Sequence, residues 1–472
     1  MIGLRSLSIL AAAALVTTSA AAAEPRSGAP AAQPADVIEV QAFRRSGVVS
    51  AWLTNGIRVH HRYMSAQSGQ VEVMISFAGG ELLECGDTRG LTLLSATCLD
   101  NPASTDATAE QLRDRLRGRD IHLEGGVASD ALLVRIWGEA DDIGPAFEVA
   151  AIALRKPRIS DAQLAEACTA ASRNVERAQS DTRWAITEPL LDLITPINEC
   201  RNKPACTKRM SAFRPDQVEA WITRHASTAP CEIAVVGDIP LDRAIALVTR
   251  SFGEFPPRQR AGVAALAPSR CIQPQQGPFV REVGCRAETD LTDAHVLAGF
   301  LSPDPSEIQE VRRLRAGARV LSQRLEERLR ELKLGGDPHV SWTYLPSPFA
   351  GRSMTVVAAS VAPDHAEPVK QIMQTSLCEL MDHGLPADEL ARSTEILARV
   401  ASAYERDPRY WATMLARSTS GGLDPELICA GAEMYRSMKP DEVLSAMRRA
   451  CTVENRLDLV VRPAAQEDRK DP

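Results

Sequence analysis

The side chains of this chain that are best suited to bind a metal or act as a nucleophile are eight histidines and eleven cysteines. The histidines are at positions 60, 61, 122, 225, 295, 339, 365 and 383. None of them forms the pattern HxxEH, in which one helical turn offers two imidazoles to a metal ion. His60 and His61 are adjacent on an expected strand, so they point to opposite faces and cannot share one ion. We expect them to be a surface pair.

The cysteines have no metal-binding pattern either, because there is no CxxC and no Cys/His cluster with zinc-ribbon spacing. In an oxidising compartment disulfides are expected instead, and the odd count leaves at least one thiol unpaired. We predict a local bridge between Cys200 and Cys206, which flank a turn-prone Asn-Lys-Pro loop. Cys271 and Cys285 flank the end of an expected linker and are candidates for a bridge that clips it.

The first 23 residues are typical of a secretory signal. Arg5 supplies the positive charge, a short apolar run follows at 7–16, and Ala23 ends a stretch of small residues suited to cleavage. Residues 24–36 then read as a flexible leader. No later apolar run is long enough to span a bilayer, and the net charge of −7 offers no basic footprint for nucleic acid. We therefore expect an exported protein of the periplasm or the cell exterior.

The chain repeats itself once. RPDQV at 214–218 corresponds to KPDEV at 439–443, and both open a helix with proline in the first turn. From 214 to 439 the offset is 225, and the β-rich runs at 233–236 and 457–461 follow near that offset. The segment DTRWA at 181–185 is matched by DPRYWA at 407–412. Two homologous lobes are the simplest explanation.

Each lobe places strands before helices. In the first lobe we expect a hairpin around Thr54-Asn55-Gly56, a strand at 71–77 and helices at 88–99, 108–116, 142–154, 160–179 and 215–226. The second lobe repeats the scheme, with strands at 293–300, 340–345 and 353–361 and a long helix at 307–333. The predicted fold class is α+β, with two lobes that each pack helices on one face of a mainly antiparallel sheet. The predicted boundaries are 37–257 for the first lobe, 258–278 for a linker, 279–465 for the second lobe and 466–472 for a tail.

In their order and spacing, several short motifs resemble the insulinase/pitrilysin family of zinc metallopeptidases, the inverzincins, whose fold is like that of the mitochondrial processing peptidase. The resemblance covers about residues 38–465. The motifs are LTNGIRV at 53–59, FAGG at 77–80, Gly90-Leu91, TAEQL at 108–112, VVGD at 235–238 and RLEERLRE at 324–331.

The resemblance also shows what this chain lacks. In active relatives HxxEH follows the Gly-Leu pair, and here Leu93, Ala96 and Thr97 stand at the positions of His, Glu and His. A third, carboxylate ligand is expected near 172–174, where there is no acid. The resemblance therefore implies no catalytic residues and no bound zinc.

The family also clamps substrate with an arginine and a tyrosine of the second lobe. Arg330 fits the arginine position, and the tyrosine position falls at or near Pro338, with Tyr344 six residues on. The stretch from 311 to 330 carries seven arginines, which we interpret as a solvated face.

These features predict a pseudoenzyme, namely a chamber-forming and substrate-binding subunit that forms a heterodimer with a zinc-bearing homologue and contacts peptide substrates. One alternative is a stand-alone peptide-binding or scaffold protein on the same fold. Another is a peptidase with an atypical site, although the sequence contains no GxSxG, no Gly-rich phosphate loop and no Cys-His signature.

Overall fold

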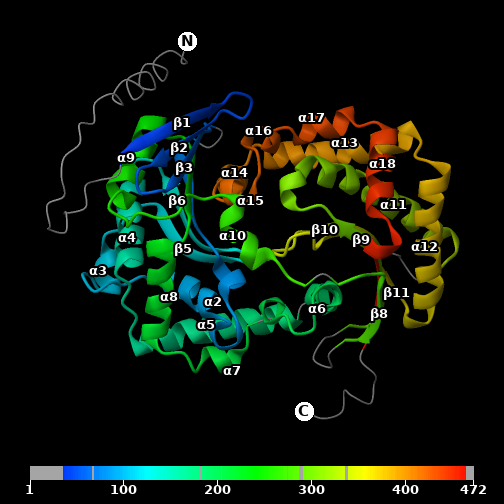
Figure 1. Cartoon of the computed structure of the whole chain (residues 1–472), viewed down its shortest axis with the longest axis horizontal. Coiled ribbons are helices and arrows are strands. Elements are labelled where there is room, and N and C mark those ends of the chain that lie inside the picture. The colour runs from blue at the N-terminus through cyan, green and yellow to red at the C-terminus, as the bar shows by residue number, and fades with distance from the viewer. Residues whose placement is uncertain are drawn as a thin grey trace.

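A computed structural model describes residues 36–65, 68–180, 182–203, 205–273, 275–285, 291–334 and 339–463. The expected signal segment 1–23 and the tail 466–472 lie outside these ranges. The described chain forms two lobes side by side, each built on one β-sheet (Figure 1). Among the described residues, no helix is both long and apolar enough to cross a membrane.

The first lobe contains a seven-stranded sheet with the order β1-β2-β3-β7-β4-β6-β5. Only the β3–β7 pair is parallel, and the other neighbours run antiparallel. The expected Asn55-Gly56 turn joins β2 to β3. The strands are β1 (Val37–Phe43), β2 (Val48–Leu53), β3 (Arg58–Tyr63), β4 (Gln70–Ala78), β5 (Ile121–Ala128), β6 (Ala131–Glu139) and β7 (Cys231–Gly237).

The second lobe repeats this topology with five strands in the order β10-β11-β9-β12-β8. The β8–β12 pair is again parallel and the rest antiparallel, so the order matches β5-β6-β4-β7-β3 of the first lobe, strand for strand. The duplication inferred from sequence is therefore a duplication of fold. The strands are β8 (Phe279–Gly284), β9 (Ala294–Ser302), β10 (His339–Leu345), β11 (Ser353–Val361) and β12 (Arg456–Arg462).

Helices cover one face of each sheet, as predicted for an α+β fold. In the first lobe the helices are α2 (Leu91–Leu99), α3 (Ala109–Asp114), α4 (Ile143–Arg155), α5 (Asp161–Ser180), α6 (Thr182–Ile194), α7 (Thr207–Met210), α8 (Pro215–Thr228) and α9 (Leu241–Phe252), with η1 (Gly80–Leu83), η2 (Gly86–Thr88) and η3 (Cys200–Asn202) as short 3₁₀ turns. The segment expected as linker contains α10 (Val263–Arg270).

The second lobe has the long helix α11 (Ile308–Glu331) where the first has α2. Its other helices are α12 (Ala366–His383), α13 (Ala387–Tyr404), α14 (Pro408–Leu415), α15 (Ser418–Gly421), α16 (Pro425–Ile428), α17 (Gly431–Ser437) and α18 (Pro440–Ala450), with 3₁₀ turns η4 (Pro305–Glu307), η5 (Pro363–His365) and η6 (Val453–Asn455).

The repeated motif of α8 and α18 explains why both helices begin where they do. Pro215 and Pro440 occupy the first turn, where the missing N–H costs nothing. The Gln217 side chain accepts a hydrogen bond from the Arg214 N–H at 2.9 Å, and Glu442 does the same for Lys439 at 3.2 Å. The same local chemistry therefore starts both helices.

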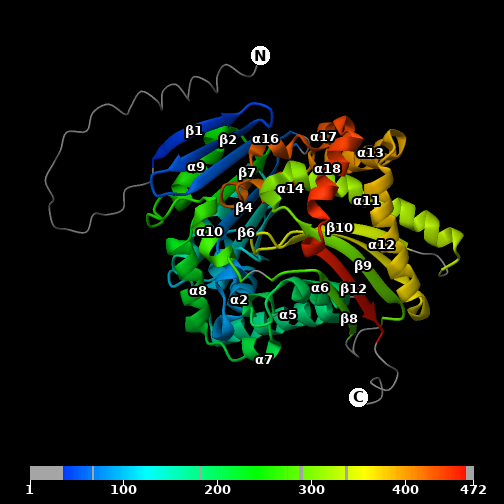
Figure 2. The same cartoon turned by 45° about the vertical axis from the view of Figure 1, so that its right-hand side comes forward.

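The two lobes exchange one helix each. Trp411 and Leu415 of α14, in the second lobe, are buried against Val236 and other residues on the face of the first sheet that its own helices leave open. Conversely, α6 of the first lobe buries Leu190 and Ile194 against the open face of the second sheet. Figure 2 shows α6 beside β8 and β12. Because α6 and α14 carry the matched DTRWA and DPRYWA segments, the exchange follows the internal repeat.

A charged cluster joins the lobes to the linker. Asp130, in the turn between β5 and β6, accepts a hydrogen bond from Arg270 of α10 at 2.8 Å and is also paired with Arg417 beside α15. The Asp130 side chain is only 12% exposed, so its carboxylate is held largely away from water. Asp130 therefore connects the β5–β6 turn of the first lobe with the linker helix α10 and with the second lobe.

Candidate functional site

Helix α2 occupies the place at which the resemblance locates a metal-binding helix. It begins after Gly90, whose φ of 108° is left-handed and suits glycine. The buried carboxylate of Glu84 accepts hydrogen bonds from the N–H groups of Gly90 at 2.9 Å and Thr92 at 2.6 Å. Arg89 binds the same carboxylate at 3.1 Å. An acid thus accepts from two N–H groups at the start of α2 and lies at the positive end of the helix dipole, which stabilises α2 in this position.

The three expected ligand positions carry no metal donor. Ala96 is 4% exposed, and Leu93 packs at the edge of the hydrophobic core. The Thr97 hydroxyl donates to the Leu93 carbonyl at 2.8 Å and is therefore committed to its own helix. Helix α5, which packs on α2, has Ser172, Arg173 and Asn174 at the expected third-ligand position.

Zinc in a catalytic site needs about three nitrogen, sulfur or oxygen ligands plus water. Throughout the described ranges, no group of three or more His, Cys, Asp or Glu side chains could hold a metal ion. The residues beside α2 and α5 therefore do not fit the zinc of active relatives, although the two helices that would carry it are in place.

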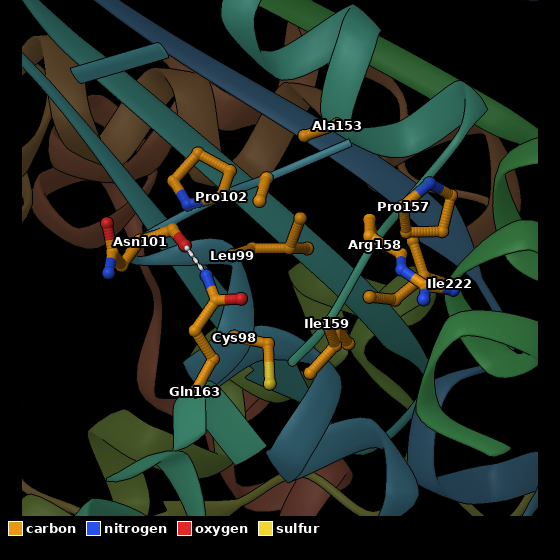
Figure 3. A pocket seen from close by; sticks show the side chains of 11 residues that line it. Cys98, Leu99, Asn101, Pro102, Ala153, Pro157, Arg158, Ile159, Gln163 and Ile222 are labelled. Atoms are coloured by element: carbon orange, nitrogen blue, oxygen red, sulfur yellow. Dashed lines mark hydrogen bonds between the residues drawn. The ribbon is translucent and has the colours of Figure 1, made fainter. Parts of the chain in front are cut away.

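A small pocket lies at the C-terminal end of α2 (Figure 3). Its volume of about 10 Å³ is at the lower limit for one water molecule, so it excludes a substrate. Gln163 closes one side by donating from Nε2 to the Asn101 carbonyl at 3.3 Å. Burial raises the pKa of Cys98 on its wall to about 12, and the nearby Cys168 adds to this effect. The Cys98 thiol therefore stays protonated and is not a nucleophile.

His225 of α8 is buried behind α2, where 1% of it is exposed. Its Nδ1–H donates to the Trp221 carbonyl at 2.9 Å, and its Nε2 is buried without a hydrogen-bond partner. Trp221 in turn donates from Nε1 to the Thr92 hydroxyl of α2 at 3.2 Å. Burial lowers the pKa of His225 to about 4, so the ring is neutral.

His60 and His61 are buried, so the expectation of a surface pair is wrong. They are 1% and 4% exposed, and they do point to opposite faces of β3. The Nε2 of His61 hydrogen-bonds the Ile239 carbonyl at 2.9 Å. His61 lies on the face of the sheet that the helices of the first lobe cover. His60 lies on the opposite face, beneath the α14–α15 segment of the second lobe.

His60 belongs to a chain of three polar side chains that has the residue types of a hydrolase triad. Its Nε2 lies 3.1 Å from Glu232, and its Nδ1 lies 2.7 Å from the Ser50 hydroxyl. Because a carboxylate only accepts, Nε2–H donates to Glu232 and the Ser50 hydroxyl donates to Nδ1. Ser50 is fully buried at 0% exposure and no substrate reaches it. The serine proton points at the histidine, but the group is sealed between the lobes.

Glu232 links this chain to the second lobe. It accepts hydrogen bonds from the Thr419 N–H at 2.8 Å and the Ser420 N–H at 2.9 Å. No local pattern in the sequence predicts this arrangement, because Glu232 and Ser420 are 188 residues apart. Ser50 and His60 lie opposite each other because β2 and β3 pair as antiparallel strands in this register.

Strand β5 is a free edge of the first sheet and lies directly against α2. A Cβ on Gly125 would come within 1.9 Å of the Ala96 carbonyl oxygen, so glycine is required for this approach. Asp100, at the C-terminal end of α2, accepts a hydrogen bond from the Gly125 N–H at 2.8 Å. That N–H points away from β6, so the outer edge of β5 is capped at this residue.

An open groove of about 590 Å³ follows the other half of this edge. Leu116, Ile121 and Leu123 provide apolar surface. Charges of both signs line the groove, from Asp100, Arg113, Arg117 and Glu124. His122 stacks on Trp137 with ring centroids 4.8 Å apart and an interplanar angle of 16°. Neither histidine spacing nor any motif pointed to this groove, because it is assembled from α3, β5 and β6.

Arg330 is exposed at the end of α11, where it pairs with Glu326 at 2.9 Å. Its role in binding substrate remains a prediction. Pro338, at the expected tyrosine position, lies outside the described residues. Tyr344 is committed elsewhere, since its hydroxyl donates to the Pro303 carbonyl at 3.0 Å.

The arginine-rich stretch of α11 is not simply a solvated face. Arg312 is 5% exposed and donates to the Ile428 carbonyl at 3.3 Å. Arg324 makes two hydrogen bonds to Glu389, at 2.6 and 2.7 Å. These contacts tie α11 to the helices around it, so several of the arginines are structural.

All eleven cysteines are free thiols in this structure. Cys200 lies in η3 and Cys206 precedes α7, on either side of the expected loop. Cys271 follows the linker helix α10 and Cys285 follows β8. The Cys200–Cys206 bridge and a bridge that involves Cys271 or Cys285 remain predictions.

Comparison with known proteins assigns the fold. The family model described as the Peptidase M16 inactive domain matches residues 212–397. The periplasmic protease PqqL from Escherichia coli is similar, with a TM-score of 0.74 and 15% identity over 98% of this chain and 51% of that protein. The chain thus spans about half the length of PqqL. No curated protein matches the chain.

Two further structures have the same fold. A peptidase M16 inactive domain from Pseudomonas fluorescens is similar over 91% of this chain and 99% of its own, with a TM-score of 0.70 and 15% identity. The ferredoxin protease FusC, solved in complex with Arabidopsis ferredoxin, gives a TM-score of 0.71 and 16% identity over 98% of this chain and 50% of that one. The matched domain and the shared fold show that this chain is similar to the insulinase-type M16 peptidases, and that residues 212–397 are similar to their inactive domain.

Proposed function

We propose that this chain is an exported, non-catalytic subunit that binds a zinc-bearing homologue and forms one half of a peptide-binding chamber. The observation that carries the proposal is the retained scaffold of α2, α5 and β5 around ligand positions that hold no metal donor. Glu84 still fixes the start of α2, and Gly125 still lets β5 approach it closely. On this proposal the chain keeps the framework of a peptidase site without its metal chemistry.

The lengths of the similar structures favour a partner. PqqL and FusC are each about twice as long as the part that this chain matches. A chain with two lobes corresponds to half of such a protein, so a second two-lobe chain would complete the same size. The free edge of β5 is a surface to which an extended peptide can add as a further strand.

The proposal is tested by mixing the chain with an HxxEH-bearing homologue from the same organism. We expect a complex by size-exclusion chromatography and a peptidase activity that neither chain shows alone. The isolated chain is expected to bind no stoichiometric zinc and to cleave no peptide, as measured by metal analysis and a fluorogenic peptide assay. Full activity of the homologue alone, with no complex at micromolar concentration, would refute the partnership.

Arg330→Ala refines this test. We expect it to lower the joint activity without separating the chains, because a forked guanidinium is suited to hold peptide carbonyls and carboxylates. Arg392→Ala is a matched control, since Arg392 pairs with Asp388 at the same i,i+4 spacing and is similarly exposed. Equal losses for the two variants would assign Arg330 to the solvated surface.

A stand-alone peptide-binding protein is the second candidate, and the groove beside β5 favours it. The distinguishing result is tight peptide binding by the isolated chain together with failure to bind any zinc-bearing homologue.

A further inference from the structure

Two cysteines lie on the two helices that would hold a metal in active relatives. Cys98 is in the last turn of α2, and Cys168 is in the first half of α5. The resemblance places two ligands on α2 and a third on α5, so a metal ion would join these helices. The ligand positions of this chain carry no metal donor, but a pair of thiols can join the same helices by a different bond.

Helices α2 and α5 approach each other closely, because small side chains lie on both of them. Helix α5 packs directly on α2. Ala96 of α2 is 4% exposed and Ala171 of α5 is fully buried, and both belong to one apolar core. Helix axes pack about 8–10 Å apart, with small contact residues at the short end of that range. Facing cysteines can then bridge, since a disulfide joins Cα atoms about 4.4–6.8 Å apart.

One hydrogen bond shows where along the two helices the thiols lie. The Gln163 side chain of α5 donates to the Asn101 carbonyl, just beyond the end of α2, at 3.3 Å. Asn101 is three residues after Cys98, and Gln163 is five residues before Cys168. Cys98 and Gln163 line the same small pocket (Figure 3). Both thiols also pack against the same apolar core, and their nearness is why Cys168 helps to raise the pKa of Cys98.

Both cysteines are free thiols in the structure. The Cys168 Sγ–H donates to the Met210 carbonyl at 3.4 Å. Because S–H is a weak donor, the loss of this contact costs little when a covalent bond replaces it. Both side chains are partly buried, so a bond between them would be shielded from reductants once the chain has folded.

We propose that Cys98 and Cys168 form a disulfide that joins α2 to α5, so that a covalent bond ties together the two helices that a metal ion would join in active relatives. The inference rests on the export in the proposed function, because the periplasm and the cell exterior allow disulfides to persist, whereas the cytosol keeps thiols reduced.

The oxidant is a protein disulfide or a small-molecule disulfide such as oxidised glutathione. The thiolate of one cysteine attacks it, forms a mixed disulfide and releases one thiol of the oxidant. The second cysteine then attacks the sulfur of the first, which closes the Cys98–Cys168 bond and releases the second thiol of the oxidant. The chain loses two electrons and two protons, and the oxidant gains them. Because burial keeps the Cys98 thiol protonated in the folded chain, the bond forms while the helices dock.

Oxidative refolding of the full chain from urea, in a buffer of reduced and oxidised glutathione, tests the inference. Proteolysis without reductant and mass spectrometry should then identify a linked pair of peptides that contain Cys98 and Cys168. We expect the bond to resist reductant in the folded chain and to open once urea is added. Free thiols at both positions after this refolding, or a bond from either one to a different cysteine, would overturn the inference.

Variants measure what the bond contributes. Oxidised Cys98→Ala, Cys168→Ala and the double variant should each lose a similar amount, roughly 5 °C or more in melting temperature. The losses are equal because each variant opens the same bond, which closes a loop of about 70 residues. After refolding with reductant, the parent and the variants should differ only by the packing of the missing thiols.

Cys231→Ala is the matched control, because Cys231 is a fully buried thiol on β7. Its loss should be the same with and without reductant, since only packing changes. If the losses of Cys98→Ala and Cys168→Ala add in the double variant and persist in reductant, the two cysteines serve only as apolar packing and the inference fails.

The same experiments separate the bond from the partnership. A Cys98–Cys168 bond in a chain that forms no complex with the zinc-bearing homologue would defeat only the partnership. A normal complex formed by a chain whose two thiols stay free after oxidative refolding would defeat only the bond. A bond that forms on refolding but is absent from the chain isolated from its own cells would defeat the export, and with it the bond in the cell.

Discussion

Among single residues, the groups best suited to acid–base chemistry serve the structure of this chain. Burial raises the pKa of Glu232, but the hydrogen bonds from His60 and Ser420 outweigh it and hold the pKa below its ordinary value. Burial lowers the pKa of His60, against the opposing effect of Glu232. The charged Glu232 and the neutral His60 are buried together with Ser50. The hydrogen bonds of Glu232 to Thr419 and Ser420 connect the two lobes.

We expect His225 to make the protein sensitive to acid. Its pKa of about 4 lies below the ordinary 6.5, so between these values the unfolded chain binds a proton that the folded chain refuses. Its contribution to stability is complete above pH 6.5 and is lost as the pH falls toward 4, by roughly 3 kcal/mol in total. We expect urea unfolding to show this loss, and His225→Leu to reduce it because the titrating group is gone.

His122 provides the control for this prediction, because its side chain is 55% exposed. His122→Leu should leave the pH dependence between 6.5 and 4 nearly unchanged. If His225→Leu kept the full pH dependence of the parent, another group would be responsible for it.

Some of these residue-level features could be predicted from sequence and others could not. The absence of HxxEH is visible in the sequence because the motif is a local pattern, expected within about one helical turn after Gly90-Leu91. The burial of His60 is invisible, because it depends on Thr419 and Ser420, which follow it by more than 350 residues. Local spacing predicts local geometry, but it contains no information on which distant surface covers a strand.

At the scale of elements, the close contact of β5 with α2 depends on Gly125, which has no side chain. Gly125→Ala would place a Cβ 1.9 Å from the Ala96 carbonyl oxygen, so the strand and the helix must separate. We expect this variant to lose roughly 1–3 kcal/mol of stability, as other overpacked sites do. Chemical denaturation measures this loss.

Gly86→Ala is the control for that variant, since a Cβ there meets no atom within 4 Å. It should change the free energy of unfolding by less than about 0.5 kcal/mol. A Gly125→Ala variant as stable as the parent would mean that β5 and α2 have room to separate without cost.

Element positions were largely predictable. The helix expected at 160–179 is α5 at Asp161–Ser180, and the strand expected at 353–361 is β11 at Ser353–Val361. Their apolar periodicity is long and regular, which is why the predictions succeeded. The role of α6 was not predictable, because its apolar residues show that it is buried but not that the sheet of the other lobe buries it.

For the whole molecule, the exchanged helices α6 and α14 mean that neither lobe has a complete core of its own. Residues 36–257 alone would expose the apolar face that contains Met74, Ala234 and Val236, which α14 covers in the intact chain. Residues 279–463 alone would expose the face that α6 covers. Each lobe therefore supplies part of the other's interior, much as the subunits of an obligate dimer do.

We expect this mutual dependence to give the chain a single melting event despite its two lobes. Calorimetry should show one transition whose van't Hoff and calorimetric enthalpies agree, because opening one sheet uncovers the other. A protease cut within 258–262, ahead of α10, should leave a nicked molecule that still elutes as one particle. Each lobe expressed alone should aggregate, and the two should recover solubility when produced together. Two resolved transitions, or a soluble isolated lobe, would mean that the covalent connection and not the interlocked helices keeps the halves together.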